Sequence, residues 1–233
     1  MTEKKSTKTR QRILEAAAKS FAGHGYYGVR LEDIAEAAGT KPGSLYYYFD
    51  SRDELVEEVL SIATTRIATS VKHAVAALPK SATCREKITV GLRTHLALIL
   101  GADYFSAASL RIETHMPPLL RRKQIVLQRE YGDFWRRLLQ ESMAKGEIDQ
   151  RFNLSVLRML IFGALNWSIE WYKPGGPMDS GEIAEELVDA IFDGVVPRSD
   201  RMNHVVDKQL GRTKSSSRRP RATAQRVNAG RDS

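Results

Sequence analysis

The sequence predicts an all-α fold, and three features of its 233 residues indicate it. Apolar residues recur at helical spacing over most of the chain. Glycine or proline marks several of the points where this pattern breaks. We find no run of alternating β-branched residues of the kind that forms a half-buried strand. Since 42% of the residues are hydrophobic, the chain can bury a sizeable core, and we expect a folded protein.

Three short helices and one long helix are predicted in the amino-terminal third. The first carries an apolar stripe and ends at a pair of glycines, and Pro42 suits the first turn of the third. Ser51 and Glu54 can form a capping box at the start of the fourth, in which each side chain accepts from the other residue's backbone amide. The expected ranges are residues 9–22, residues 31–39, a helix beginning at Pro42, and residues 51–75.

Five further helices are predicted in the rest of the folded part. Asn153 or Ser155 can cap the fourth of them, which reaches Trp171 and is followed by the loop sequence KPGGP. Beyond residue 197 the chain is poor in apolar residues and rich in arginine and serine, so we expect residues 198–233 to be a disordered basic tail. The expected ranges are residues 84–100, 103–114, 118–145, 153–171 and 180–195.

The net charge of +8 is divided unevenly along the chain. Residues 1–12 carry +4 and residues 198–233 carry +7, which leaves −3 on the body between them. Two basic ends on a mildly acidic body indicate local contacts with phosphates rather than diffuse binding to polyanions. The alternative is that the charged ends only keep the protein in solution.

Several classes of protein are disfavoured by the sequence. The longest apolar runs, at residues 96–100 and 159–165, are too short to span a bilayer, and no secretory signal precedes the first helix. With Cys84 as the only cysteine, we expect a cytoplasmic protein. The five histidines show no metal-ligand spacing, and no nucleophile elbow or phosphate-binding loop is present. We therefore expect neither an enzyme nor a bound metal or cofactor.

The stretch GTKPGSLYYYF carries the features of a helix that reads DNA. On a helical wheel Leu45, Tyr46 and Phe49 share an inward face, Tyr47 points to the opposite side, and Tyr48 flanks the outer side. Reading helices enter the major groove with their amino end first, and hydroxyl groups of Ser and Tyr bond to phosphates. The alternative is a three-helix packing unit without a role in DNA binding.

Residues 8–68 resemble the amino-terminal domain of the tetracycline-repressor (TetR) family of bacterial transcription regulators. The segments DIAEAAG, GSLYYYF and SRDEL lie in the family's register. Many relatives have an arginine where this chain has Glu32, so we expect a phosphate contact to shift to Arg30. The resemblance implies an all-α homodimer with a helix-turn-helix at about residues 31–50 and a second, ligand-binding domain at residues 69–197. It also implies a set of DNA-contacting residues, namely Thr40, Lys41, Gly43, Ser44, Tyr47 and Tyr48, with Arg52 as a phosphate contact. Arg30 joins this set through the shifted contact.

The carboxyl-terminal half resembles, more weakly, the ligand domain of the family branch that regulates fatty-acid and steroid catabolism. The shared part is mainly WYKPGG and the helix after it. Large aromatic residues there could line a pocket, although large aromatic residues dominate cores generally and most of these are expected to be core residues. The last two helices are our candidates for the dimer interface. The residues expected to orient a ligand are polar or aromatic: His95, Tyr104, Arg111, Glu113, Asn166, Trp167 and Glu170.

The sequence therefore predicts a repressor that binds a palindromic operator as a homodimer. A small, largely apolar effector, such as an acyl-CoA or lipid-like catabolite, would release it. Two alternatives remain open at this point. One is an activator with the same DNA-binding domain, and the other is an all-α binding protein that recognises no DNA sequence.

Overall fold

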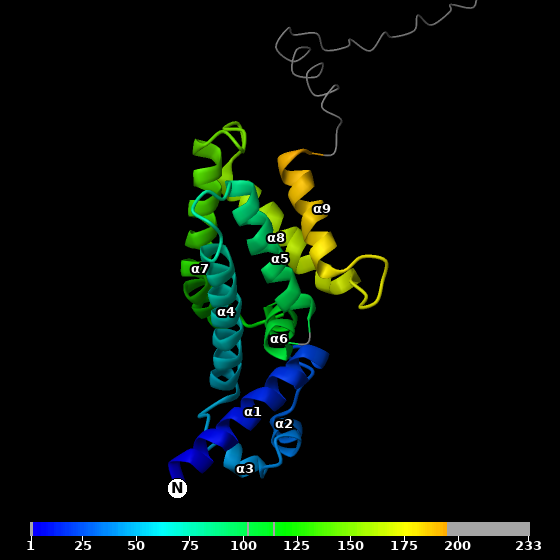
Figure 1. Cartoon of the computed structure of the whole chain (residues 1–233). Coiled ribbons are helices and arrows are strands. Elements are labelled where there is room, and N and C mark those ends of the chain that lie inside the picture. The colour runs from blue at the N-terminus through cyan, green and yellow to red at the C-terminus, as the bar shows by residue number, and fades with distance from the viewer. Residues whose placement is uncertain (1, 102, 114, 195–233) are drawn as a thin grey trace, which may run out of the picture. The chain divides into compact units, whose positions relative to one another are not determined.

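The computed structural model describes residues 2–101, 103–113 and 115–194, with side chains from Ser6 onward. This part of the chain contains nine helices and no strand, which confirms the predicted all-α fold class. The predicted tail at residues 198–233 lies outside the described residues. The helices, labelled in Figure 1, are α1 Thr2–His24, α2 Leu31–Ala37, α3 Pro42–Leu45, α4 Arg52–Ala76, α5 Cys84–Leu100, α6 Tyr104–Glu113, α7 Pro118–Ala144, α8 Leu154–Trp171 and α9 Ser180–Phe192.

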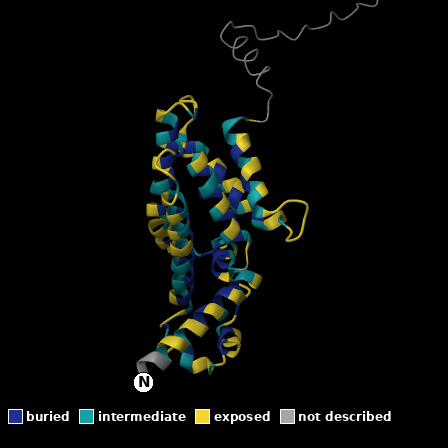
Figure 2. Ribbon diagram, viewed as in Figure 1, coloured by how far each residue is buried: buried dark blue, intermediate teal, exposed yellow. Residues whose placement is uncertain are grey.

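Two hydrophobic cores meet along α4. The first is built by α1, α2, α3 and the beginning of α4, and α6 closes it through Phe105, Ala108 and Ile112. The second is built by the remainder of α4 with α5, α7, α8 and α9. Ala63 belongs to the first core and Ile67, one turn later, belongs to the second. Figure 1 shows α1, α2 and α3 together at one end of α4, and Figure 2 shows buried residues between the helices. The domain boundary predicted near residue 68 stays a prediction.

Several helix ends differ from the expected ranges: α2 ends at Ala37 rather than at residue 39, and α9 ends at Phe192 rather than near residue 195. Helix α1 begins at Thr2 rather than near residue 9, because residues 2–8 contain no glycine or proline and are mostly neutral or favourable for a helix. Helix α3 is only four residues long and ends at Leu45, so the three tyrosines that follow lie in a turn. This shortening changes the assignment of the tyrosines, as described below.

The predicted caps are present with one change. The Ser51 hydroxyl accepts from the Glu54 amide, but the Glu54 carboxylate accepts from the amide of Asp50, at 2.6 Å, so the reciprocal half of the capping box is displaced by one residue. Asn153 is the cap of α8, and its side-chain oxygen accepts from the amides of Ser155 and Val156. The choice left open between Asn153 and Ser155 is thereby decided.

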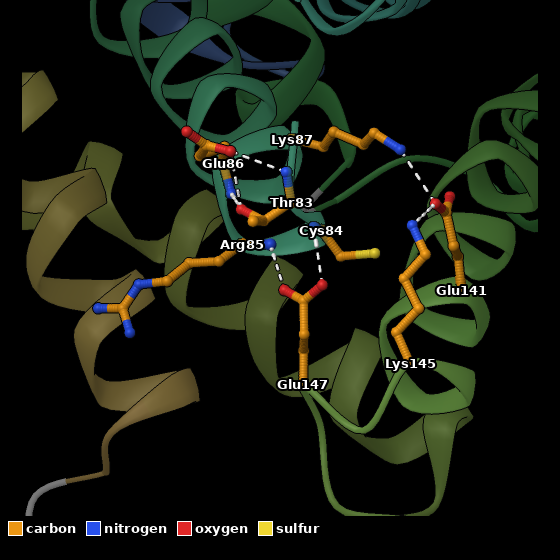
Figure 3. A network of polar contacts seen from close by, with 8 residues as sticks. All are labelled: Thr83, Cys84, Arg85, Glu86, Lys87, Glu141, Lys145 and Glu147. Atoms are coloured by element: carbon orange, nitrogen blue, oxygen red, sulfur yellow. Dashed lines mark hydrogen bonds and ion pairs between the residues drawn. The ribbon is translucent and has the colours of Figure 1, made fainter. Parts of the chain in front are cut away.

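The start of α5 is fixed by a polar network that the sequence pattern did not reveal (Figure 3). Thr83 and Glu86 form a capping box, and the Glu147 carboxylate accepts from the amides of Cys84 and Arg85, at 3.0 and 2.9 Å. Backbone amides at a helix amino end otherwise lack partners, so a carboxylate there is favourable. This network ties the loop after α7 to α5.

Candidate functional site

The first candidate site is the segment of residues 38–49, which we call the recognition tip. Figure 2 shows that this end of the molecule is largely exposed. Lys41, Pro42 and Gly43 are exposed, whereas Leu45 and Phe49 are completely or almost completely buried. Apart from the neighbouring residues of the chain and the backbone of its own helix, no described atom lies within 4 Å of a Cβ placed on Gly43. The tip is therefore anchored by two apolar side chains and presents the amino end of α3 outward.

The three tyrosines of the tip do not divide as predicted. Tyr47 is 80% exposed, as expected, but Tyr46 is 56% exposed and does not join the core, so its inward assignment is wrong. Tyr48 is the half-buried one: it packs against the first core and meets the Tyr47 ring edge-on at 5.2 Å. On a helical wheel Tyr46 and Tyr48 lie about 80° to either side of the midpoint between Leu45 and Phe49, so the wheel alone could not choose between them. The turn after α3 decides in favour of Tyr48.

The backbone entering the tip is held in place by Arg12 of α1. Gly39 has φ +61° and ends α2 in a Schellman motif, in which the Thr40 amide donates to Ala35 and the Gly39 amide to Glu36. The Arg12 guanidinium donates to the carbonyls of Ala38 and Gly39. A Cβ on Gly39 would lie 3.1 Å from Arg12 Nη2, so the arginine uses the space that glycine leaves. The position of Thr40 and Lys41 therefore depends on a contact between α1 and the end of α2.

The two other predicted arginines have different surroundings. Arg52 is half-buried: it donates to the Tyr26 carbonyl and lies 4.6 Å above the Tyr26 ring, while the Tyr26 hydroxyl donates to Asp53. Burial raises the pKa of Tyr26. Arg30 precedes α2 without forming a side-chain cap, and its side chain is 77% exposed. Arg52 is thus used to hold the loop before α2, whereas the exposed Arg30 side chain forms a surface ion pair with Glu32, with 3.8 Å between Nε and Oε2.

The second candidate site is a cavity of about 560 Å³ enclosed by α4 to α8. Three of the residues expected to orient a ligand, His95, Glu113 and Asn166, line it. The walls also contain apolar groups from each of the five helices, among them Ile67, Ile99, Leu110, Ile125 and Phe162. An apolar cavity with a few convergent polar groups is the usual form of a small-molecule site.

His95 is a buried polar residue of the cavity wall. Its Nδ1 forms a 2.8 Å hydrogen bond with the Tyr131 hydroxyl, whereas its Nε2 has no hydrogen-bond partner. Burial lowers the pKa of His95 to about 4. The nearby Asn166 side chain acts to raise this pKa, but its position does not meet the geometry of a hydrogen bond to Nε2. His95 is therefore neutral near pH 7.

Glu113 is the second unusual group, and burial raises the pKa of its carboxyl. Its Oε1 accepts three hydrogen bonds, from Ser109 Oγ, Gln124 Nε2 and Gln128 Nε2, at 3.2, 3.1 and 2.7 Å. Gln124 Nε2 also lies 3.1 Å from Thr64 Oγ1. A single carboxyl oxygen thus connects α6 with α7 and, through Gln124, with α4.

The other four residues expected to orient a ligand are not among the residues that line the cavity. Tyr104 and Trp167 are 51% and 66% exposed, and Arg111 forms a surface ion pair with Glu170, with 3.5 Å between Nη1 and Oε1. The cavity is instead lined by residues of α7 and α8 that the sequence analysis missed. The spacing of α7 offered a signal, because positions 124, 128 and 131 share one face of a helix. The additional polar residues are Gln128, Arg129, Tyr131, Asp133 and Arg158.

Helix α8 also carries an exposed apolar stripe. Its large members lie at positions 156, 160, 167 and 171, spaced so that they share one face, and Gly163 lies exposed among them. The side chains are Val156, Leu160, Trp167 and Trp171, each at least half exposed. A contiguous apolar surface of this kind commonly marks a protein interface.

Two other kinds of site were sought in the described part of the chain. No helix there is long and apolar enough to cross a membrane. Within the same residues, no three His, Cys, Asp or Glu side chains converge to hold a metal ion.

Comparisons with known families match both parts of the chain. The family described as "Bacterial regulatory proteins, tetR family" matches residues 13–59. The family described as "Tetracyclin repressor-like, C-terminal domain" matches residues 81–195. The first range contains α2, α3 and the recognition tip, and the second begins before α5 and contains the greater part of the cavity wall.

Individual relatives agree with these matches. The HTH-type transcriptional repressor KstR2 of Mycolicibacterium smegmatis is 26% identical, over 80% of this chain and 90% of the relative. The TetR family transcriptional regulator PfmR from Thermus thermophilus has 26% identity and a TM-score of 0.68, covering 79% of this chain and 99% of its own. AibR, solved with isovaleryl coenzyme A and operator DNA, has a TM-score of 0.71 over 79% of this chain and 98% of its own, and at 21% identity it shares the fold.

Proposed function

Since the chain belongs to the tetR family of bacterial regulatory proteins, which are transcriptional regulators and not enzymes, we propose that it is an effector-responsive repressor that binds a palindromic operator as a homodimer. The observation that carries this proposal is the combination of an exposed recognition tip with a cavity containing unsatisfied polar groups. The two are joined by α4, which contributes to both cores.

In this proposal the amino end of α3 enters the major groove. Lys41 and Ser44 would contact phosphates, Tyr47 would reach a base edge or phosphate, and Arg30 would contact the backbone beside α2. The open space around Gly43 would let the DNA backbone approach closely. Tyr46, which is exposed, joins this set, whereas Arg52 serves to position the loop before α2.

The homodimer would form through α8 and α9. The exposed stripe of α8 would pair with its symmetry mate, and α9 would complete a four-helix bundle. A twofold dimer places two recognition tips on one face of DNA, with half-sites about one turn, roughly 34–36 Å, apart.

The effector would occupy the cavity, and an acyl-CoA thioester is our leading candidate. AibR, which shares the fold, has been solved with isovaleryl coenzyme A. Two arginines that line the cavity, Arg129 and Arg158, have no acidic or hydrogen-bonded partner among the described residues. They could therefore receive the anionic part of such a ligand, while the apolar wall receives its acyl chain.

Release from DNA would follow from the arrangement of α6. This helix lines the cavity with Ser106, Ser109 and Leu110, and its Phe105 and Ile112 belong to the core of the recognition domain. A ligand that favours a shifted α6 would therefore also favour a shifted α1, and with it a changed spacing of the two tips. The size of the shift is limited by the ligand's differential affinity for the two states.

The test is a selection of bound duplexes from a random library, followed by binding measurements on the selected sequence. A palindromic consensus is expected. Tyr47→Ala should weaken binding to it about tenfold or more, while Tyr104→Ala, which removes an exposed tyrosine far from the tip in sequence, should not. Recovery of only random sequence would refute the proposal. A series of acyl-CoA thioesters of increasing chain length, with free coenzyme A as control, then tests release of the duplex.

A further inference from the structure

The unpartnered Nε2 of His95 indicates what the effector must carry. We propose that the effector has a neutral oxygen function, a hydroxyl or a carbonyl group, within its apolar body, and that this group hydrogen-bonds to His95 beside Asn166. The inference rests on the proposed role of the cavity as the effector site. It goes further by naming a chemical group that a plain hydrocarbon chain lacks.

The first argument is that the His95 ring is fixed. Nδ1 is engaged by the Tyr131 hydroxyl, the Tyr131 ring lies nearly parallel to the imidazole at 6.0 Å, and the Phe162 ring meets it edge-on at 5.5 Å. Rotating the imidazole to satisfy Nε2 would break the hydrogen bond at Nδ1. Nε2 therefore stays without a partner in the wall of the cavity.

The second argument is energetic. A buried polar atom without a hydrogen bond lowers the equilibrium constant for folding by about five- to 150-fold, so native structures seldom leave one without a reason. A ligand that supplies the missing partner recovers this free energy, whereas an apolar ligand in the same place does not. Sites of this kind reject analogues that lack the hydrogen-bonding group far more strongly than apolar sites reject an extra methylene.

The third argument is that the group must be neutral. The imidazole is neutral near pH 7, and the cavity also contains the largely buried Glu113 carboxyl, which would repel an anion when ionised. The two cationic lining residues lie nearer the solvent, since Arg129 is exposed and Arg158 half-buried. An anionic end of the effector would bind there, so the group at His95 is uncharged.

Glu113 offers a second position for such a group. All three of its hydrogen bonds fall on Oε1, so Oε2 has no hydrogen-bond partner among the described residues. A ligand hydroxyl at Oε2 would contact the carboxyl that connects α6, α7 and, through Gln124, α4. A ligand with two oxygen functions could therefore engage both His95 and Glu113.

The test uses two neutral probes of nearly equal shape, 2-naphthol and 2-methylnaphthalene, titrated against the full chain by calorimetry. We expect the wild type to prefer 2-naphthol about tenfold or more, which corresponds to the lower half of the cost of one unpaired polar atom. In His95→Leu this preference should fall to within about threefold, while 2-methylnaphthalene still binds, which shows that the cavity is intact. His95→Phe, which also lacks Nε2, serves as a second variant if His95→Leu does not fold. Tyr104→Phe lies outside the cavity and should keep the full preference.

Three outcomes would overturn the inference: equal binding of the two probes by the wild type, binding of neither, or a preference that survives in the cavity variants. Duplex selection on the same preparations separates this failure from that of the proposed function. A protein that selects a palindrome, is released by an acyl-CoA, but shows no preference for the hydroxyl would refute only the inference. A protein that selects no sequence would refute the proposed function itself.

Discussion

The recognition tip and the cavity both carry polar side chains, but they hold these side chains in opposite ways. In the tip the backbone is fixed by Leu45, Phe49 and Arg12, and the polar side chains extend into water with few partners. In the cavity the polar side chains are themselves fixed, and one of their atoms, His95 Nε2, is buried without a partner. Exposed polar groups cost nothing while DNA is absent, whereas buried ones destabilise the protein until a ligand satisfies them. Substitutions should therefore separate binding from stability in the tip and couple them in the cavity.

The largest effect is expected from the anchor of the tip. Leu45→Ala should lower the free energy of unfolding by roughly 2–5 kcal/mol, because a completely buried leucine leaves a cavity when it is truncated. Tyr46→Ala, one residue later, should change it by less than about 0.5 kcal/mol, because that ring is mostly exposed. Urea unfolding of both variants measures the difference. A large loss of stability in Tyr46→Ala would restore the inward face that the helical wheel suggested.

The next effect is the loss of stability that a lower pH causes through the buried His95 of the cavity. Because the pKa of His95 is lowered to about 4 in the folded protein, the unfolded chain binds a proton at this residue below its ordinary pKa of 6.5 while the folded chain does not. The stability that this residue contributes is therefore complete above pH 6.5 and is lost as the pH falls to about 4, by up to about 3 kcal/mol. The raised pKa of Glu113 acts with the opposite sign, since the folded protein retains its proton above pH 4.5.

The difference between wild type and His95→Leu isolates the histidine. From pH 7 to pH 4 the wild type should lose up to about 3 kcal/mol of unfolding free energy relative to the variant, because the variant lacks the group that the folded state keeps neutral. A difference that stays constant across this range would mean that the pKa of His95 is not lowered, and that the imidazole is less deeply buried than the structure indicates.

Sequence reasoning succeeded where the signal is local and less well where contacts are distant. The apolar stripes, Ser51, Asn153 and the exposed Tyr47 follow from helical spacing and capping chemistry. The assignments of Tyr46 and Tyr48 did not, because they depend on where a four-residue helix ends. In the cavity His95, Glu113 and Asn166 were identified by residue type. Arg111 and Glu170 were identified in the same way, although they form a surface ion pair. Residue type cannot distinguish these cases, since the distinction requires knowing which helix faces cross.

A smaller effect should link α1 to the recognition tip through Arg12. Arg12→Met removes the donors to the Ala38 and Gly39 carbonyls, which water can replace, so the loss of stability should be about 1 kcal/mol. Operator binding should fall more than this, because Thr40 and Lys41 follow the released backbone directly. Gln11→Met, at the neighbouring exposed position of α1, is the matched control and should alter neither quantity. Equal operator affinity of the two variants would show that Arg12 does not position the tip.

The smallest effect concerns Glu141, whose titration must be separated from that of His95 in the acid measurement. Glu141 accepts from Lys87 and Lys145 at the far end of α7 (Figure 3), and these two hydrogen bonds, chiefly the one from Lys145, lower its pKa to about 2. Its contribution is thus present above the ordinary pKa of 4.5 and is lost as the pH falls from there toward 2, a window below that of His95. Because water screens this partly exposed group, Glu141→Gln should cost less than about 1 kcal/mol at pH 7. It should also leave the slope between pH 6.5 and 4.5 unchanged. If that slope changed as well, the acid sensitivity could not be assigned to the cavity. The pH series would then no longer show that binding and stability are coupled at the buried site but not at the exposed one.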